Sequence, residues 1–177
     1  MPVVSDSGPL IHLAQTNQIS LLKRIFGRVL IVAPVKREVV DEGIRRAHPD
    51  ARLIAEGLAD GYIVVDRTSG RLTSRASKLV KQENVSESDA LTLLLAKTLQ
   101  KPLLTDEKIL SMLAKMYSLE AWNTWTILLE ALRKNLIEKS EIHKAIDELA
   151  ERRHKLSSGD ATQILDVADR IAATKPS

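Results

Sequence analysis

The chain has no cysteine, few aromatic residues and no long apolar run, and each absence narrows what the protein can be. Without cysteine, its 177 residues can form neither a disulfide, nor a thiolate zinc site, nor a cysteine nucleophile. Aromatic residues make up only 3% of the chain, which argues against a surface of aromatic rings that stack on bases. No apolar run reaches the roughly 18 residues that a membrane-spanning helix needs. These absences predict a cytoplasmic protein with a core of Leu, Ile, Val and Ala.

What the chain does contain is typical of a globular protein. Hydrophobic residues make up 44% and charged residues 28%, and the length suits one domain, or one domain with an appendage. The formal net charge is +3. This small positive excess permits an anionic partner such as a nucleic acid, but it does not demonstrate one.

Short apolar runs alternate with helical patterns through most of the chain. Strands are predicted at Val3–Ser5, Val29–Ala33, Tyr62–Asp66 and Pro102–Asp106, with a possible edge strand at Ser118–Ala121. Helices are predicted at Leu10–Phe26 (with a break near Asn17), Val35–Arg45, Ala51–Ala59, Leu72–Glu83, Ala90–Gln100, Glu107–Met116 and Thr124–Lys134. This alternation indicates a three-layer α/β/α domain around a central parallel sheet of four to five strands.

The last forty or so residues depart from this alternation. Apolar residues recur at helical spacing in Ser140–His154 and in Asp160–Ala172, and Ser157–Gly159 separates the two segments as a turn. We therefore expect a helical hairpin that packs on the main domain or on a second subunit. The predicted domains are residues 1–136 and a C-terminal helical extension, residues 137–177.

Acidic residues stand close to the carboxyl ends of the predicted strands. They are Asp6 after the first strand, Glu38 in the helix after the second, Glu87 and Asp89 at the start of the Ala90 helix, and Asp106 after the fourth strand. Ligands of open parallel sheets bind beyond the carboxyl ends of the strands, near the strand where the chain order reverses. A central first strand would place Asp6 at that position.

Each of these acids also has a purely structural interpretation. Asp6 could cap the helix that follows it, and Asp106 could cap the helix that begins at Glu107. Asp89 stands three residues after Ser86, which is the spacing of a capping box. Glu38 could be an ordinary solvated helix residue.

Taken together, the acids favour a metal site. The carboxyl ends of parallel strands meet at one edge of the sheet, so the carboxylates would converge there and repel one another by roughly 1–4 kcal/mol for each close pair. A divalent cation would remove this repulsion. Oxygen ligands without cysteine or clustered histidine favour Mg²⁺ or Mn²⁺ over zinc. Such sites commonly carry out phosphodiester hydrolysis.

Other chemistries of α/β proteins fit the sequence less well. A haloacid-dehalogenase phosphatase needs a second aspartate two residues after the first, but position 8 is Gly. Neither the glycine pattern of dinucleotide-binding folds nor that of phosphate-binding P-loops follows the first strand.

With these acids in place, the sequence resembles the PIN-domain family of metal-dependent nucleases, which includes the VapC-type toxins of toxin–antitoxin pairs. The resemblance lies in Asp6 within Val4–Ser7, Glu38 within Val35–Val39, Asp89 within Glu87–Leu91, and Asp106 within Leu103–Asp106. It spans roughly the first 125 residues.

The resemblance implies a PIN-like fold and an endoribonuclease. Asp6, Glu38, Asp89 and Asp106 would be catalytic, and Asp6, Asp89 and Asp106 would bind one or two Mg²⁺ or Mn²⁺ ions, while Ser7, Glu87 and Thr124 would support them. Glu87 competes with Asp89 for the third acidic position. The resemblance also implies an RNA substrate, an antitoxin partner if the protein is a toxin, and a homodimer. A catalytically inactive PIN-like module that binds RNA or a protein is the alternative.

Basic and imidazole side chains add little to the predicted site. Lys36 and Arg37 are the best candidates for RNA phosphate contacts, because they adjoin Glu38. The four histidines share no metal-ligand spacing. We expect His12 to lie in or beside the core and assign none of them to catalysis.

Overall fold

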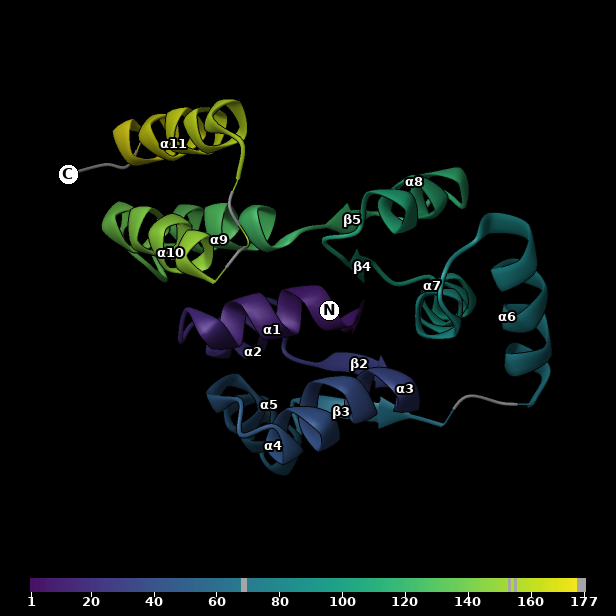
Figure 1. Cartoon of the computed structure of the whole chain (residues 1–177). Coiled ribbons are helices and arrows are strands. Elements are labelled where there is room, and N and C mark those ends of the chain that lie inside the picture. The colour runs from purple at the N-terminus through teal and green to yellow at the C-terminus, as the bar shows by residue number, and fades with distance from the viewer. Residues whose placement is uncertain (68–69, 153, 155, 175–177) are drawn as a thin grey trace. The chain divides into compact units, whose positions relative to one another are not determined.

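The computed structural model describes residues 1–67, 70–152, 154 and 156–174 (Figure 1). The chain divides into two compact units, Met1–Asn123 and Thr124–Ser177. The first unit holds all of the described strands, and the second consists of helices. The division falls before the predicted boundary at residue 137, and it assigns the helix that begins at Thr124 to the second unit.

A parallel sheet of five strands forms the centre of the first unit. The strands are β1 (Val3–Ser5), β2 (Val29–Val32), β3 (Ile63–Asp66), β4 (Leu103–Leu104) and β5 (Ala121–Trp122). Their order across the sheet is β3-β2-β1-β4-β5. Val4 of β1 pairs with Leu30 on one side and with Leu103 on the other, so β1 is the central strand. The chain order reverses at β1, as the prediction for Asp6 requires.

Helices cover both sides of this sheet, which confirms the three-layer prediction (Figure 1). They are α1 (Ser7–Gln15), α2 (Ser20–Phe26), α3 (Ala33–Lys36), the π-helix η1 (Arg37–Glu42), α4 (Gly43–Arg45), α5 (Pro49–Ala59), α6 (Gly70–Glu83), α7 (Glu87–Leu99) and α8 (Lys108–Met116). The predicted break near Asn17 is present, and Asn17 there adopts a positive φ of 55°. The helix predicted at Val35–Arg45 is continuous but changes to π-helical geometry in its middle.

The buried helix α7 holds the layers of the first unit together. Every residue from Ala90 to Ala96 is buried, and α7 packs against β1, β2 and β4 as well as against α3, α6 and α8. Each fully buried Leu side chain contributes about 1.5–3 kcal/mol to the free energy of unfolding. The strands β1 and β4 are also buried throughout. Asp6, which follows β1, and Asp89, in the first turn of α7, are therefore attached to buried elements of the core.

Two predicted strands differ from the observed ones. The fourth strand ends at Leu104 and not at Asp106, because the Thr105 hydroxyl accepts the Glu107 backbone N–H at 3.1 Å and turns the chain. The fifth strand lies at Ala121–Trp122 and not at Ser118–Ala121. The backbone N–H groups of Ser118 and Leu119 donate to carbonyls of α8, and Ser118 has a positive φ of 56°. These residues therefore terminate α8 and do not begin the strand. The fifth strand is an edge strand, as predicted.

The second unit comprises α9 (Thr124–Arg133), α10 (Lys139–Glu151) and α11 (Ser158–Ala173). Both α10 and α11 pack against α9 and against each other, and the apolar stripe of α10 is buried at Ile142, Ala145 and Leu149. The Ser157 hydroxyl caps α11 by accepting the Asp160 backbone N–H at 3.1 Å. No helix in the described part of the chain has the length and apolar character to cross a membrane.

Candidate active site

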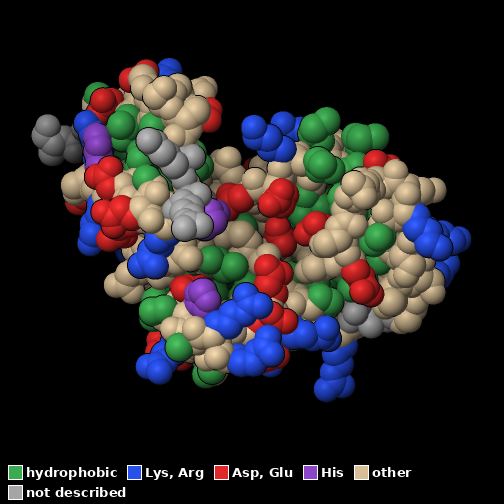
Figure 2. Space-filling model, in the orientation of Figure 1, with side chains coloured by type: hydrophobic (Ala, Val, Ile, Leu, Met, Phe, Trp, Pro, Cys, Tyr) green, Lys and Arg blue, Asp and Glu red, His purple; other side chains and the backbone are tan. Residues whose placement is uncertain are grey.

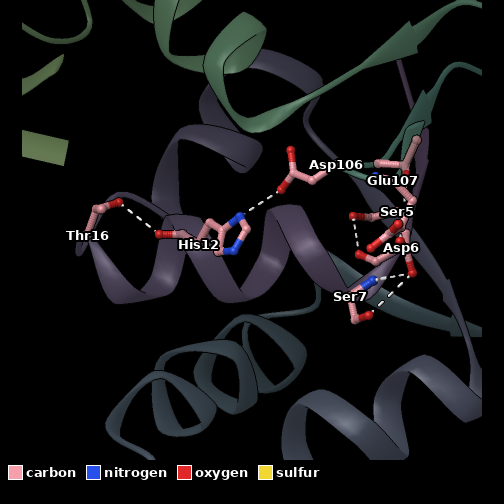
Figure 3. A network of polar contacts seen from close by, with 8 residues as sticks. Ser5, Asp6, Ser7, His12, Thr16, Asp106 and Glu107 are labelled. Carbon is pink, nitrogen blue, oxygen red and sulfur yellow. Dashed lines mark hydrogen bonds and ion pairs between the residues drawn. The ribbon is translucent and has the colours of Figure 1, made fainter. Parts of the chain in front are cut away.

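Asp6 lies directly after the central strand and at the start of α1. Its backbone N–H donates to the Leu104 carbonyl of β4 at 2.9 Å, which fixes its main chain at the carboxyl end of the central strands. Its Oδ1 accepts the Ser7 backbone N–H at 2.6 Å and the Ser7 hydroxyl at 3.3 Å (Figure 3). Asp6 is therefore the N-cap of α1. The structural interpretation of Asp6 holds, and it does not exclude a second role.

The second carboxylate oxygen of Asp6 faces the loop after β4. The buried Thr105 hydroxyl donates to Asp6 Oδ2 at 3.3 Å, and the same hydroxyl accepts the Glu107 N–H. Both oxygens of Asp6 are thus engaged by neighbours on two different elements. These bonds restrict the orientation of a carboxylate that is only 3% exposed.

Burial and neighbouring acids shift the pKa of Asp6. Its pKa is raised to about 6, chiefly because burial disfavours the charged form. The hydrogen bonds from Ser7 and Thr105 oppose this rise, whereas the negative charges of Asp89 and Glu38 add to it. The structure therefore brings carboxylates from η1 and α7 within electrostatic range of Asp6. In Figure 2, acidic side chains gather in the middle of the face in view.

Asp89 belongs to the first turn of α7 and takes part in its cap. Its Oδ2 accepts the Ser86 N–H at 3.2 Å, and its own N–H donates to the Ser86 hydroxyl at 3.0 Å, which completes the predicted capping box. It is half-buried, whereas Glu87 at the first position of α7 is exposed. Since the charge of Asp89 acts on Asp6, the electrostatics favour Asp89 over Glu87 as the third acid.

Glu38 and the two predicted phosphate contacts lie on or beside the π-helix η1. Glu38 and Arg37 are exposed, and π-helical turns occur frequently at functional sites. The Lys36 ammonium pairs with the Asp41 carboxylate at 2.5 Å, so part of its charge is already neutralised within the chain. Arg37 is accordingly the better placed of the two for a phosphate.

Asp106 is held by α1. Its Oδ2 lies 2.8 Å from Nδ1 of His12, and the carboxylate points toward the imidazole (Figure 3). It does not cap the next helix, because the N-cap of α8 is Glu107, which makes no side-chain cap bond. The contact joins residues 94 positions apart.

Two side chains at this edge were not predicted to belong to the site, His12 and Thr105. Thr105 adjoins a predicted site residue, so its position in the sequence could have suggested a contact with Asp6. His12 offered a weaker signal: it stands one helical turn after Gly8 and hence on the same face of α1. Thr124, predicted as a supporting residue, begins α9 in the second unit. Its role beside the acids stays a prediction.

The donor set at this edge suits a hard divalent cation in its chemistry. The candidate ligands are carboxylate oxygens, and the buried charge of Asp6 is disfavoured unless a cation compensates it. Within the described ranges, however, no group of three or more His, Cys, Asp or Glu side chains stands close enough together to hold a metal ion. The acids at this edge are thus of the type that binds such an ion, but in the described residues they do not form a three-ligand site.

The chain matches a known protein family. A family model described as a PIN domain matches residues 2–170 of the chain. The matched range includes the sheet, the acids at its edge and the helices of the second unit up to α11. No curated protein matches the chain.

Proposed function

Because this chain belongs to the PIN-domain family, whose members are generally nucleases, we propose that it is a metal-dependent endoribonuclease that hydrolyses RNA phosphodiesters at the acids around Asp6. The observation that carries this proposal is the position of Asp6, which is buried directly after the central strand β1 and has the charges of Asp89 and Glu38 acting on it. An acid buried beside other acids weakens the fold when it is ionised, and a divalent ion would offset that effect.

The acids would divide the work at the reacting phosphate. Asp6, Asp89 and Asp106 are the side chains that would hold Mg²⁺ or Mn²⁺, and such an ion supplies a nucleophilic water and stabilises the leaving oxygen. Ser7 and Thr105 keep the Asp6 carboxylate in one orientation through their hydrogen bonds. Glu38, which is exposed, would act as the proton acceptor.

Single-stranded RNA cleavage tests this proposal. We expect the parent to cut RNA in Mn²⁺ and to stop when EDTA removes the metal. Asp6→Asn and Asp106→Asn should each reduce the rate by at least about a hundredfold, in keeping with the loss of a preorganised electrostatic group. Asp147→Asn, which changes an exposed acid of α10, serves as the control and should cut like the parent. If both site variants cut as well as the parent, the assigned acids are wrong.

The alternative is a catalytically inactive PIN-like module that binds RNA or a protein. The absence of a preformed three-ligand group in the described residues and the engagement of Asp106 by His12 favour it. Such a module would bind RNA with a strong salt dependence and would show no turnover with any divalent metal.

We further propose that the nuclease is the toxin of a toxin–antitoxin pair and acts as a homodimer. In that case the antitoxin would cover the acidic edge and block RNA. The toxin role is supported if the product of a neighbouring gene suppresses cleavage. The homodimer is supported if light scattering gives twice the molar mass of one chain.

A further inference from the structure

The helix α6 carries the excess positive charge of the chain. Its 14 residues include four basic side chains and one acidic side chain, a net charge of +3 that equals the net charge of the whole chain. The basic residues are Arg71, Arg75, Lys78 and Lys81, and all of them are exposed. The rest of the chain is therefore formally neutral, and α6 concentrates the charge that can attract a polyanion.

The buried residues of α6 determine which way its basic side chains point. Those residues are Leu72, Ala76 and Leu79, and α6 packs against α7. Arg71, Arg75 and Lys78 follow one another at spacings of four and three residues, so they form a row on the solvent side of the helix. In Figure 2, Lys and Arg side chains protrude at the right of the view, where Figure 1 places α6. We call Arg71, Arg75, Lys78 and Lys81 the basic face of α6.

The stability of the helix does not explain this basic face. Arg71 is the second residue of α6, where the positive end of the helix dipole disfavours a cation. Arg71 and Arg75 are four residues apart, and like charges at that spacing destabilise a helix by about 0.2–0.5 kcal/mol. Within the described residues, none of the four basic side chains forms an ion pair. A partner with negative charges would compensate them.

The composition of the face favours a nucleic acid over a membrane as that partner. Basic helices that lie on membranes insert an apolar face into the lipid, whereas the apolar face of α6 is buried in the protein. The other exposed residues of α6 are Gly70, Ser74, Ser77, Gln82 and Glu83. None of these has an apolar or aromatic side chain, so the face can neither enter lipid nor stack on bases. Guanidinium and ammonium groups in a row suit the phosphates of a nucleic acid backbone.

The basic face lies in the same unit as the acids around Asp6. Three residues separate the end of α6 at Glu83 from the start of α7 at Glu87, so these two ends are at most about 14 Å apart. Asp89 belongs to the first turn of α7. A strand that follows the basic face toward its C-terminal end therefore approaches the acids.

From these observations we propose that the basic face of α6 binds the phosphodiester backbone of RNA and directs the strand toward the acids. The inference rests on the RNA substrate of the proposed function and deepens it, but it requires neither a metal ion nor cleavage. Because the contacts are with phosphates, binding through α6 is independent of base sequence.

The test titrates a fluorescently labelled single-stranded RNA with the full chain in EDTA at several salt concentrations and follows the anisotropy. We expect Arg71→Gln/Arg75→Gln/Lys78→Gln to reduce the slope of log affinity against log salt by about 2, since each phosphate contact on a single strand adds about 0.7. The affinity at low salt should fall by at least about tenfold. Arg71→Lys/Arg75→Lys keeps both charges and should keep the slope. An unchanged slope in the glutamine variant overturns the inference.

A matched variant of the second unit controls for the total charge. Lys144→Gln/Arg152→Gln/Arg170→Gln removes three exposed cations from α10, its C-terminal cap and α11, and it should keep the slope of the parent. If this control loses as much of the slope as the α6 variant, net charge and not the basic face governs binding, and the inference is wrong.

The unfolding midpoint distinguishes binding from a structural role. Glutamine keeps a high helix propensity, and its substitution at Arg71, Arg75 and Lys78 removes like-charge repulsion. The glutamine variant should therefore unfold at the same temperature as the parent or at a higher one. A lower midpoint would mean that the basic face stabilises the fold and would contradict the inference.

Vesicles that contain phosphatidylserine test the membrane alternative. At physiological salt the parent should remain in solution when the vesicles are sedimented. If the parent sediments with the vesicles, and the glutamine variant loses this binding while its RNA slope is unchanged, the basic face binds a membrane and the inference is overturned.

Cleavage in Mn²⁺ separates the inference from the proposed function. The glutamine variant should raise the KM for RNA. A parent that binds RNA through α6 and cuts none contradicts the proposed function and supports the inference. A parent that cuts RNA, with a glutamine variant that keeps both the slope and the KM of the parent, overturns the inference alone.

Discussion

At the scale of single residues, Asp6 is both a helix cap and a buried carboxylate with a raised pKa. It caps α1 through Ser7, yet burial and neighbouring acids raise its pKa from 3.8 to about 6. A difference of roughly two pKa units corresponds to about 3 kcal/mol between the folded and unfolded states when the group is ionised. A cap alone would not need a buried carboxylate, because asparagine caps helices equally well.

The pH dependence of stability tests this account of Asp6. The folded-state pKa lies above the unfolded value, so the folded protein holds the proton more tightly and loses stability as the pH rises from about 4 through about 6. In metal-free buffer we expect Asp6→Asn to match the parent near pH 4 and to exceed it by about 2–3 kcal/mol at pH 7. Urea unfolding at several pH values measures the difference.

Asp147→Asn is the control for this comparison, since it changes an exposed acid of α10 and should track the parent at every pH. An Asp6→Asn variant less stable than the parent at pH 7 would contradict the raised pKa.

The sequence predicted some of these residues for physical reasons and could not predict others. Asp6 was recognisable because a lone carboxylate follows buried β-branched residues and precedes a helix start. The contact between His12 and Asp106 was not predictable, because it joins positions 94 apart and depends on how α1 and the β4 loop pack. For the same reason His12 was expected merely in or beside the core.

At the scale of elements, the start of α7 holds Asp89 through a capping box, and two substitutions separate its roles. Ser86→Ala removes the hydroxyl that accepts the Asp89 N–H and should lower the free energy of unfolding by about 1 kcal/mol while RNA cleavage persists. Asp89→Asn keeps an oxygen that can accept the Ser86 N–H, so stability should change little while cleavage falls. Chemical denaturation and cleavage rates on both variants provide the measurement. Equal cleavage by Asp89→Asn and the parent would restrict Asp89 to capping.

Element types were predictable from period and composition, whereas element ends were not. The alternation of apolar runs and helical patterns indicated the parallel sheet. The ends of β4 and β5 depended on the Thr105 hydroxyl and on the backbone bonds that close α8. The apolar pattern predicts an ordinary α-helix here and gives no signal for the π-helical geometry of Arg37–Glu42.

At the scale of the whole molecule, chain order determines which residues meet. With β1 at the centre of the sheet, residues after β1 and β4 and residues of η1 and α7 approach one edge. The net charge is +3, so basic side chains outside these acids are available to attract a nucleic acid.

The salt dependence of RNA binding tests whether Arg37 and Lys36 contact RNA phosphates. Each phosphate contact on single-stranded RNA adds about 0.7 to the slope of log affinity against log salt. We expect Arg37→Ala to reduce the slope by about that amount. Lys36→Ala should reduce it less, because Asp41 already pairs with Lys36. Fluorescence anisotropy in EDTA, which prevents cleavage, measures both slopes. The opposite ranking would place the phosphate at Lys36.

The central claim is that acids from separate segments meet at the end of β1 and share a divalent ion. The most direct test is the free energy of unfolding of the parent and of Asp6→Asn as Mn²⁺ is added at pH 7. We predict that the parent gains about 2.7 kcal/mol at a hundredfold excess over its dissociation constant, and that Asp6→Asn gains almost nothing. A parent that does not respond to Mn²⁺, or an Asp6→Asn variant that gains as much as the parent, would contradict the claim.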